Sequence, residues 1–459
     1  MEILERVGVK IHEINALRMI DEVGAEVNPR EKTARIPEHL VREALKRAPG
    51  SFTLYGRDPS YKLVFGGKRV IFSLQGKGAF VLDLKTGRRR PSTSEDVGLL
   101  ARLVDALENL HHVALAITAN DFPPPVAYLH EFLELVRNTR KTVDGDIYTE
   151  NVAMDTVKMA SIIRGGEDEL RRKPMLLGFY NPVSPLQHSE ELLRGMRIYA
   201  KYKQPILVAP ECQAGATAPI TLAGLLVQQN AEVLSGIALI EFTNPGTPVL
   251  YGTVSTVMDM MTGNIALGAI EAGLVNVATA QLARYYGLPS RGFGGTTESK
   301  LVDVQAGFEK AITLMMAALG GINFIYDAGG SLESTLTASY ELTVVDDEIC
   351  GMVLRALRGI EVDERTLALD VIERVGPGGH FLSEKHTLEH LRKECYIPKL
   401  IDRKRREAWE AAGSRSLREN AIKEVERILE EHRPEPLPPH VEKDLVDYVK
   451  RREREILRS

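Results

Sequence analysis

The sequence is poor in cysteine and carries little net charge. Its 459 residues include three cysteines, Cys212, Cys350 and Cys395, and no two of them form a CxxC pair. This scattered distribution argues against a disulfide framework and predicts a reducing, cytoplasmic compartment. The formal net charge is only −5, with basic residues spread along the chain. We therefore expect no nucleic-acid-binding surface.

Membrane, nucleotide and nucleophile motifs are also missing. No run of about 18 uncharged apolar residues occurs, so no membrane span is expected. The N-terminal MEILERVGVKIHE has the pattern of neither a signal peptide nor a transit peptide. There is no GxGxxG after a strand-like run, no Walker A loop and no GxSxG. His386 and His390 are four residues apart, but no third ligand is evident, so no metal site is predicted.

What the sequence does contain is a regular alternation of short apolar runs and helical stretches from Ser94 onward. Seven such runs each precede a helical segment: HVALAITAND, KTVDGDIYTE, PMLLGFYNP, PILVAPECQ, TPVLYGTVST, SRGFGGTTES and INFIYDAGG. An eighth strand comes from either RVIFSLQG upstream or ELTVVDDE downstream, and the pattern does not decide between them. Eight strand–helix units favour a closed TIM (β/α)8 barrel over an open Rossmann-like sheet.

The segments before and after this alternation differ from it in composition and in the spacing of their apolar residues. Residues 1–95 combine helical spacing with short β-prone runs, which predicts an N-terminal cap of helices and a small sheet. We assign the barrel to residues 96–350. Residues 351–459 are helical and highly charged, and we expect an extension that completes the barrel and makes contacts in a homo-oligomer. For the charged tail itself, alternating charge signs favour a solvated helix face, and packing between subunits or contact with a partner protein is the alternative.

Aromatic and charged residues collect after the predicted strands, where the active site of a parallel barrel lies. Tyrosine and phenylalanine ring faces attract quaternary ammonium groups, and a carboxylate adds Coulombic attraction. A packing role is the alternative for each aromatic residue. Arg291, Lys300 and His380 are the candidates to meet a substrate carboxylate. The expected substrate-binding residues are Phe179, Tyr180, Glu211, Tyr251, Tyr326, Glu333 and His380.

Glycines follow three successive predicted strands, at Gly252, at Gly294 and Gly295, and at Gly329 and Gly330. Glycine lets a flat ligand or a partner surface approach the backbone closely. Simple loop flexibility is the other interpretation of these positions.

Long collinear segments resemble the trimethylamine methyltransferase family, over roughly residues 8–405. They include IHEINALRMIDEVGAEV, RIPEHLVREALKRAPGSFTLYGRDP, GATAPITLAGLLVQQNAEVLSG, PVLYGTVSTVMDMMTG, EAGLVNVATAQLARYYGLPSRGFGGTTESKLVDVQAGFEKA and GPGGHFLSEKHTLEHLRKECYIPKLIDR. The resemblance implies a TIM barrel that binds a small methylated amine and presents it to Co(I) of a corrinoid. That corrinoid is carried by a separate partner protein, so no cofactor is bound permanently and no side chain acts as the nucleophile. The residues then expected to face the corrinoid are Gly252, Ser255, Gly294, Gly295, Thr296, Gly329 and Gly330.

One departure from the family concerns pyrrolysine. Members that use trimethylamine carry this residue in the active site, at a position expected here between about Ser290 and Ser334, yet every residue of this chain is standard. A quaternary ammonium needs no such activation, because a neutral amine leaves directly. The resemblance therefore implies a quaternary amine such as glycine betaine, proline betaine, carnitine or choline.

Three alternatives remain open from the sequence. The first is a family homologue with another methyl donor. The second is a metal-dependent barrel enzyme that uses Asp144, Asp146, Glu211 and Asp259. The third is a non-catalytic scaffold that binds an amine or a corrinoid protein.

Overall fold

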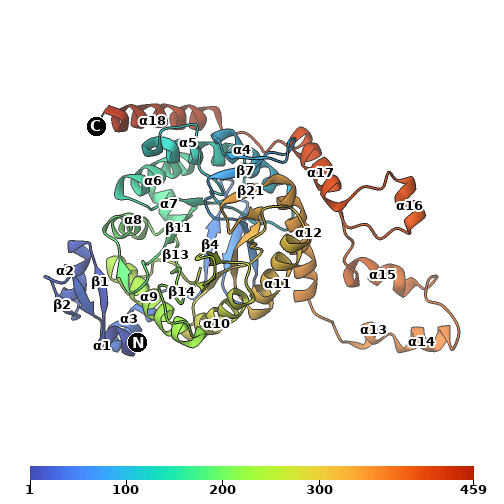
Figure 1. The fold of residues 1–459 in the computed structure, drawn as a ribbon, viewed down its shortest axis with the longest axis horizontal. Helices are drawn as coiled ribbons and strands as arrows, with labels where there is room; N and C mark the ends of the chain where they lie inside the picture. Colours follow the sequence, from blue (N-terminus) through green and yellow to red (C-terminus); the bar gives the residue numbers. More distant parts are fainter. Residues whose placement is uncertain (459) are drawn as a thin grey trace.

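The computed structural model describes residues 1–458, and eight parallel strands form a closed barrel at its centre (Figure 1). All seven of the predicted runs supply a barrel strand, and the TIM-barrel prediction is confirmed. In chain order the strands are β6 (Ile71–Leu74), β9 (His112–Val113), β10 (Thr142–Gly145), β11 (Leu176–Tyr180), β13 (Ile206–Val208), β15 (Val249–Gly252), β18 (Ser290–Phe293) and β19 (Phe324–Gly329).

The eighth strand comes from the upstream run RVIFSLQG. Its β6 pairs with β19 through Ile71 and Phe324, and with β9 through Ser73 and His112. The downstream run ELTVVDDE instead lies in helix α12 (Tyr340–Leu357), which Ser339 caps at its N-terminus. The barrel thus takes a strand from the segment expected to be a cap and begins before residue 96. The division into 1–95, 96–350 and 351–459 otherwise stays a prediction.

Eight helices surround the strands and lie on the outside of the barrel. Hydroxyl or carboxylate side chains cap several of them at the N-terminus, as Thr93, Thr149, Thr221 and Asp303 do. The helices are α4 (Ser94–Ala106), α5 (Pro124–Arg137), α6 (Glu150–Arg164), α8 (Glu190–Lys201), α9 (Leu222–Thr243), α10 (Ile270–Tyr286), α11 (Val304–Gly320) and α12, with the short α7 (Glu167–Arg172) after α6.

Two small sheets stand at the carboxyl ends of the barrel strands, a region we call the barrel mouth. Because they follow barrel strands directly in sequence, they partly roof the mouth. One sheet contains β20 (Ser331–Leu332), β21 (Thr337–Ser339), β7 (Phe80–Leu82) and β8 (Arg89–Pro91). The other contains β14 (Gln213–Ala214), β16 (Thr256–Met258) and β17 (Ile265–Ala266).

The N-terminal segment covers one side of the barrel. Its helices α1 (Glu2–Arg6), α2 (Ile14–Glu22) and α3 (Glu38–Arg47) all pack against α9. Strands β1 (Val9–Ile11), β3 (Thr33–Arg35) and β2 (Glu26–Asn28) form a sheet with β12 (Gln187–His188). A hairpin of β4 (Phe52–Tyr55) and β5 (Lys62–Phe65) then leads to β6.

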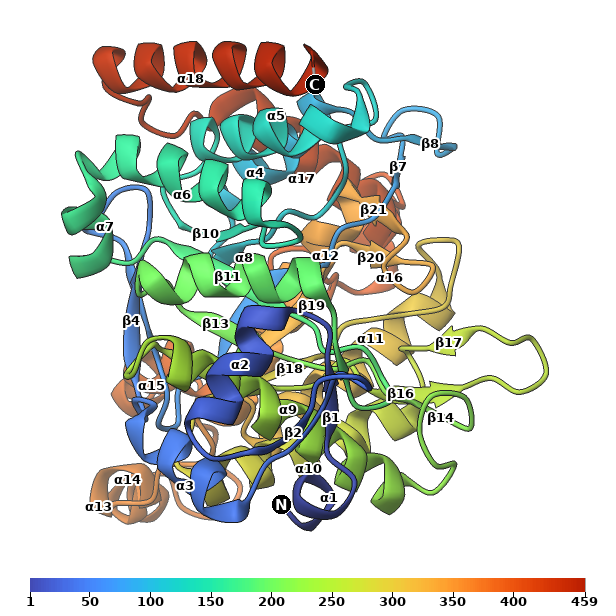
Figure 2. The same ribbon diagram turned by 90° about the vertical axis from the view of Figure 1, so that its left-hand side faces the viewer.

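The C-terminal segment covers another side. Helix α17 (Leu417–Glu431) packs against α12 and α4, and α18 (Pro439–Arg458) lies across α5 and α6 (Figures 1 and 2). Residues 358–405, which we call the arm, project from the end of α12 (Figure 1). The arm contains α13 (Glu364–Leu367), α14 (Leu369–Val375) and α15 (Lys385–Glu394), and α16 (Arg406–Ala411) follows it. The charged tail is thus more than a solvated face, because its apolar side covers barrel helices.

Helix α9 is 22 residues long and is the one described helix that is apolar and long enough to cross a membrane by length and composition. Of its apolar window, 67% is buried inside the protein. It lies between the strands β13 and β15 and the N-terminal helices. Its composition is therefore explained by burial on two sides within the barrel wall.

Candidate active site

Two aromatic rings and one arginine meet at the barrel mouth. The ring centroids of Phe179, at the end of β11, and Tyr326, in β19, are 6.4 Å apart. The guanidinium carbon of Arg291, in β18, lies 5.2 Å from the first centroid and 5.0 Å from the second. Arg291 is only 2% exposed. These distances place a cation against both ring faces, as in a cation–π interaction.

Three carboxylates, Asp144, Glu211 and Asp327, interact electrostatically with the same arginine. Asp327 Oδ2 lies 3.9 Å from Arg291 Nη2, and Asp327 Oδ1 accepts a hydrogen bond from the Gly76 amide at 2.7 Å. Burial raises the pKa of Glu211 and of Asp327, and the nearby guanidinium opposes this rise. The mouth therefore has more acidic than basic groups and favours a cationic ligand.

Asp144 is held in a fixed orientation by a chain of polar contacts. Its Oδ1 lies 2.8 Å from His112 Nε2, and its Oδ2 accepts a hydrogen bond from the Tyr326 hydroxyl. His112 is fully buried, and its Nδ1 lies 2.9 Å from Thr142 Oγ1. The histidine fixes the carboxylate, and the carboxylate in turn fixes one of the two rings.

Arg291 retains a buried donor atom without a partner within residues 1–458. Its Nη1 donates to the carbonyl of Thr253, whereas its Nε is buried and has no hydrogen-bond partner among the residues that the structure describes. A buried donor left without a partner costs free energy, about 1–3 kcal/mol. The Nε atom is therefore a ready contact for an acceptor on a ligand.

A pocket of about 600 Å³ lies next to the mouth, at the ends of β6, β9 and β10. Lys77 Nζ lies 2.6 Å from Glu131 Oε2 and 2.9 Å from Asp146 Oδ2 in its wall. Tyr148 adds a ring whose centroid is 5.5 Å from the Lys77 nitrogen. Because Lys77 already has two carboxylate partners, this pocket offers no free cation of its own.

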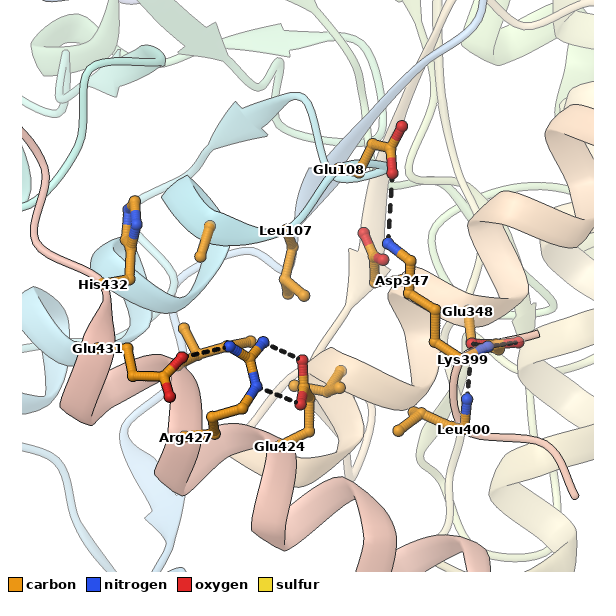
Figure 3. A pocket seen from close by; sticks show the side chains of 13 residues that line it. Leu107, Glu108, Asp347, Glu348, Lys399, Leu400, Glu424, Arg427, Glu431 and His432 are labelled. Carbon is orange, nitrogen blue, oxygen red and sulfur yellow. Dashed lines mark hydrogen bonds and ion pairs between the residues drawn. The ribbon is translucent and has the colours of Figure 1, made fainter. Parts of the chain in front are cut away.

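A second cavity, of about 460 Å³, lies between α4, α12 and α17 (Figure 3). Its charged groups pair with one another, with Lys399 3.3 Å from Glu108 and Arg427 2.6 Å from both Glu424 and Glu431. No barrel strand contributes to its wall. It is therefore a gap where the C-terminal segment meets the barrel helices.

No group of three or more His, Cys, Asp and Glu side chains is arranged to hold a metal within residues 1–458. Of the four acids proposed for a metal-dependent enzyme, Asp259 lies in the turn after β16 and accepts from the amides of Met261 and Thr262. It does not join Asp144 at the mouth.

Comparison with known proteins identifies the group to which the chain is related. The family model described as trimethylamine methyltransferase (MTTB) matches residues 1–457. The glycine betaine methyltransferase of Desulfitobacterium hafniense strain Y51 is 38% identical over 458 residues, which cover 99% of this chain and 95% of that protein. The trimethylamine methyltransferase MttB of strain DSM 10664 / DCB-2 is 39% identical over 459 residues, covering 99% and 91%.

The chain belongs to the trimethylamine methyltransferase family.

The resemblance recognised in the sequence is thus confirmed, and the protein is a methyltransferase. The fold agrees with this. The monomethylamine methyltransferase MtmB of Methanosarcina barkeri aligns with a TM-score of 0.52 at 12% identity, covering 94% of this chain and 96% of that one. At this identity the likeness supports the barrel fold alone.

Two tyrosines expected to bind substrate in this methyltransferase face away from the mouth. Tyr180 is fully buried, and its hydroxyl lies 2.6 Å from His188 Nδ1, behind the strand. Tyr251 is also fully buried and donates to Asn230 of α9 at 2.9 Å. Successive side chains point to opposite sides of a strand, so Tyr180 faces the helix layer because Phe179 faces the mouth.

Two further expected ligands lie elsewhere in the methyltransferase. Glu333 is in the turn between β20 and β21, where its carboxylate pairs with Arg89 at 2.6 Å. His380 is exposed in the arm. Of the three candidates for a substrate carboxylate, Lys300 is also exposed, and only Arg291 reaches the mouth.

The seven residues expected to face a corrinoid are all buried in the methyltransferase: Gly252, Ser255, Gly294, Gly295, Thr296, Gly329 and Gly330. A Cβ atom on Gly252 would lie 2.9 Å from the Cβ of Ala209, so this glycine permits close packing of the barrel wall. The hydroxyl of Thr296 donates to the carbonyl of Leu267 at 2.7 Å. The structure does not expose these residues as a docking surface.

Sequence reasoning missed His112 and gave Arg291 only a minor place. His112 occupies the first position of a barrel strand, far from the polar residues that follow it. A histidine beside apolar residues is usually a packed core residue, and only its contact with Asp144 reveals the link to the mouth.

Proposed function

We propose that this methyltransferase takes a methyl group from a quaternary amine, glycine betaine foremost, and passes it to Co(I) of a corrinoid on a partner protein. The observation that supports this most directly is the cation held against Phe179 and Tyr326. Rings and carboxylates that hold a guanidinium also suit a trimethylammonium group. The 38% identity to a glycine betaine methyltransferase points the same way.

The corrinoid is a substrate of this reaction and supplies the nucleophile that accepts the methyl carbon. The work of the barrel is orientation and electrostatics. The bond between nitrogen and the methyl carbon breaks, and its electron pair stays on nitrogen, so a neutral tertiary amine is left. Because the product has lost its positive charge, Phe179, Tyr326 and the carboxylates bind it more weakly and favour its release.

Arg291 supports a substrate that also carries a carboxylate. We infer that its unpaired Nε, together with its charge, binds the carboxylate of a betaine, while the ammonium end lies toward Glu211 and the ring of Phe179. Choline has no carboxylate, so this arrangement ranks betaines above choline. The scattered cysteines are consistent with a cytoplasmic location for the reaction.

The test is methylation of a Co(I) corrinoid protein by the purified enzyme. Glycine betaine, proline betaine, carnitine, choline and trimethylamine are supplied separately, and formation of methyl-cobalt is followed by absorbance. We expect methyl-cobalt from the quaternary amines, fastest with a betaine, and none from trimethylamine. Activity with trimethylamine alone would overturn the proposal.

Two variants at Phe179, which is partly exposed, link the activity to the ring. A cation–π contact stabilises by about 0.5–2 kcal/mol, so Phe179→Ala should raise KM about 2- to 30-fold. Phe179→Trp keeps a ring face and serves as the matched control, with KM close to the wild-type value. An equal KM for both variants would show that the ring of Phe179 does not contribute to substrate binding.

A further inference from the structure

The outer faces of the barrel helices differ in what covers them. Helices α1 to α3 pack on α9, α17 packs on α4 and α12, and α18 packs on α5 and α6. Helix α8 carries charged residues such as Glu191, Arg194 and Lys201 on its outer side, and its Arg197 pairs with Glu13 of the N-terminal segment at 3.0 Å. The outer sides of helices α10 and α11 carry exposed large apolar residues instead, beside the polar Gln281 and Arg284 of α10, and Tyr285 at the end of α10 interacts with Arg42 of α3.

The apolar residues of α10 and α11 form stripes along the helices. On α11, Val304, Phe308, Ile312 and Leu319 recur at intervals of four and seven residues and are exposed, Val304 to 83%. On α10, Leu274 and Tyr285 are exposed, and α10 packs beside α11. Such spacing puts each set on one side of its helix. We call these six residues the α10–α11 face.

The arm, like this face, exposes large apolar side chains to solvent. Ten of its large apolar side chains are more than 40% exposed, and Ile360, Leu382 and Leu388 reach 86%, 87% and 79%. Helices α13 and α15 have no buried residue. Isolated helices of this length are marginal in water, so the arm needs a surface to pack against.

We propose that the arm of one copy of the chain covers the α10–α11 face of a second copy. Both surfaces are apolar, and each chain supplies one of each, so two copies satisfy both at once. The arm starts at the end of α12, which packs against α11, so it leaves the barrel beside the face. A two-fold axis there lets the two arms exchange and merges their contacts into one self-complementary interface.

The amount of apolar surface fits such an interface. Full burial of a large apolar side chain removes roughly 60–120 Å² of apolar area from water. Ten partly exposed arm residues then supply area on the order of the 800 Å² that one partner of a standard interface buries. Single exposed apolar residues are common on monomers, but two extended apolar surfaces on one chain are not.

The experiment measures the mass of the full chain in solution by sedimentation velocity and light scattering at micromolar concentration. We expect the wild type to sediment as an assembly of at least two copies. Leu382→Asp with Leu388→Asp in the arm should convert it to monomers. Phe308→Asp with Ile312→Asp on the α10–α11 face should do the same. All four side chains are exposed, so circular dichroism and the melting temperature of the monomers should stay close to those of the wild type.

A matched control and a mixing experiment make the test specific. Met261 is 97% exposed in the turn between β16 and β17 and belongs to neither surface, and Met261→Asp should leave the assembly intact. Mixing the arm variant with the face variant gives one intact arm and one intact face, so mixed dimers should form although neither variant associates alone. Native mass spectrometry distinguishes these mixed dimers by mass.

Several outcomes would overturn the proposal. A monomeric wild type whose arm variant is more extended would mean that the arm folds onto its own barrel. A monomeric wild type whose arm variant no longer binds the corrinoid protein would mean that a different partner covers the arm. An assembly that survives both pairs of substitutions would use another surface.

Discussion

Arg291 combines three properties that rarely occur together in one residue: full burial, contact with two rings and an unpaired donor. A lysine keeps the charge near Thr253 and Asp327 but lacks the planar fork that binds a carboxylate. Substitution of Arg291 therefore tests recognition of the carboxylate end of a betaine separately from recognition of its ammonium end.

Arg291→Lys should impair betaine substrates selectively. A hydrogen bond to a charged group contributes about 1.5–3 kcal/mol, so kcat/KM for glycine betaine should fall about 10- to 100-fold. The value for choline should change much less, because choline has no carboxylate to lose contact with. Initial rates of methyl-cobalt formation with the two substrates measure this, and an equal loss for both would contradict the assignment.

Glu241, fully buried in α9, makes stability depend on pH. Its Oε2 accepts from the Gly246 amide, its Oε1 has no partner among the described residues, and burial raises its pKa to about 7 from an ordinary 4.5. Between these values the native state binds the proton that the unfolded chain has released. This group therefore makes the protein less stable as pH rises from about 4.5 to 7.

Glu241→Gln, which stays neutral, should flatten this dependence. At pH 8 it should raise the free energy of unfolding by about 1–3 kcal/mol, because an ionised carboxylate no longer has to be buried. Urea unfolding at pH 5 and pH 8 measures the change. The exposed Glu22, substituted in the same way, should leave both values unchanged.

At the residue level the sequence assigned Phe179, Glu211 and Tyr326 to the correct strand–loop segments, but it did not separate them from Tyr180 and Tyr251. In LLGFY both faces of the strand are apolar, because one lines the barrel and the other packs under a helix. Such a strand carries no alternation from which inward and outward positions can be read. Contacts across the barrel, such as Tyr326 of β19 with Asp144 of β10, depend on closure and have no local signal.

The elements themselves were more predictable than the residues they present. Seven strands were recognisable because each short apolar run precedes a helix of clear periodicity. ELTVVDDE misled because its β-branched residues suit a strand, whereas the Ser339 cap and the packing of α12 on α11 and β19 make it helical. The cover that α17 and α18 give to barrel helices had no signal beyond their apolar stripes.

Among the elements, α18 is anchored in part by a buried carboxylate of α6, in addition to its buried apolar residues Val441, Leu445 and Val449. Asp155 is 2% exposed and accepts hydrogen bonds from Tyr128 at 2.5 Å, from Tyr448 at 2.6 Å and from Arg452 at 2.8 Å. These three side chains come from α5 and α18. Asp155 therefore joins three helices at one point.

Asp155→Asn should lower the free energy of unfolding by about 2–4 kcal/mol, because the partly buried Arg452 then keeps only its pair with the half-exposed Glu455. Hydrogen exchange should speed up in α18 before it does so in the barrel strands. Urea unfolding and exchange mass spectrometry measure both effects. Asp168, fully exposed and paired with Arg171, provides the control, and Asp168→Asn should change neither.

For the molecule as a whole, the segments before and after the barrel determine which barrel helices are exposed to solvent. The N-terminal helices lie on α9, whose composition is apolar enough for a membrane helix. Deletion of residues 1–47 should expose α9 and cause aggregation and strong binding of a hydrophobic dye. Size-exclusion chromatography and dye fluorescence measure this, and a monodisperse product with unchanged fluorescence would mean that α9 tolerates solvent.

The pairing of β6 with β19 also determines when the barrel can close during protein synthesis. The paired residues Ile71 and Phe324 are about 250 positions apart in the chain. At about 5–20 residues per second, the ribosome needs roughly 10–50 seconds to produce the second strand after the first. During that interval β6 has β9 as its only barrel neighbour, and the growing sheet carries an open edge. We therefore expect the nascent chain to bind chaperones until its eighth βα unit emerges.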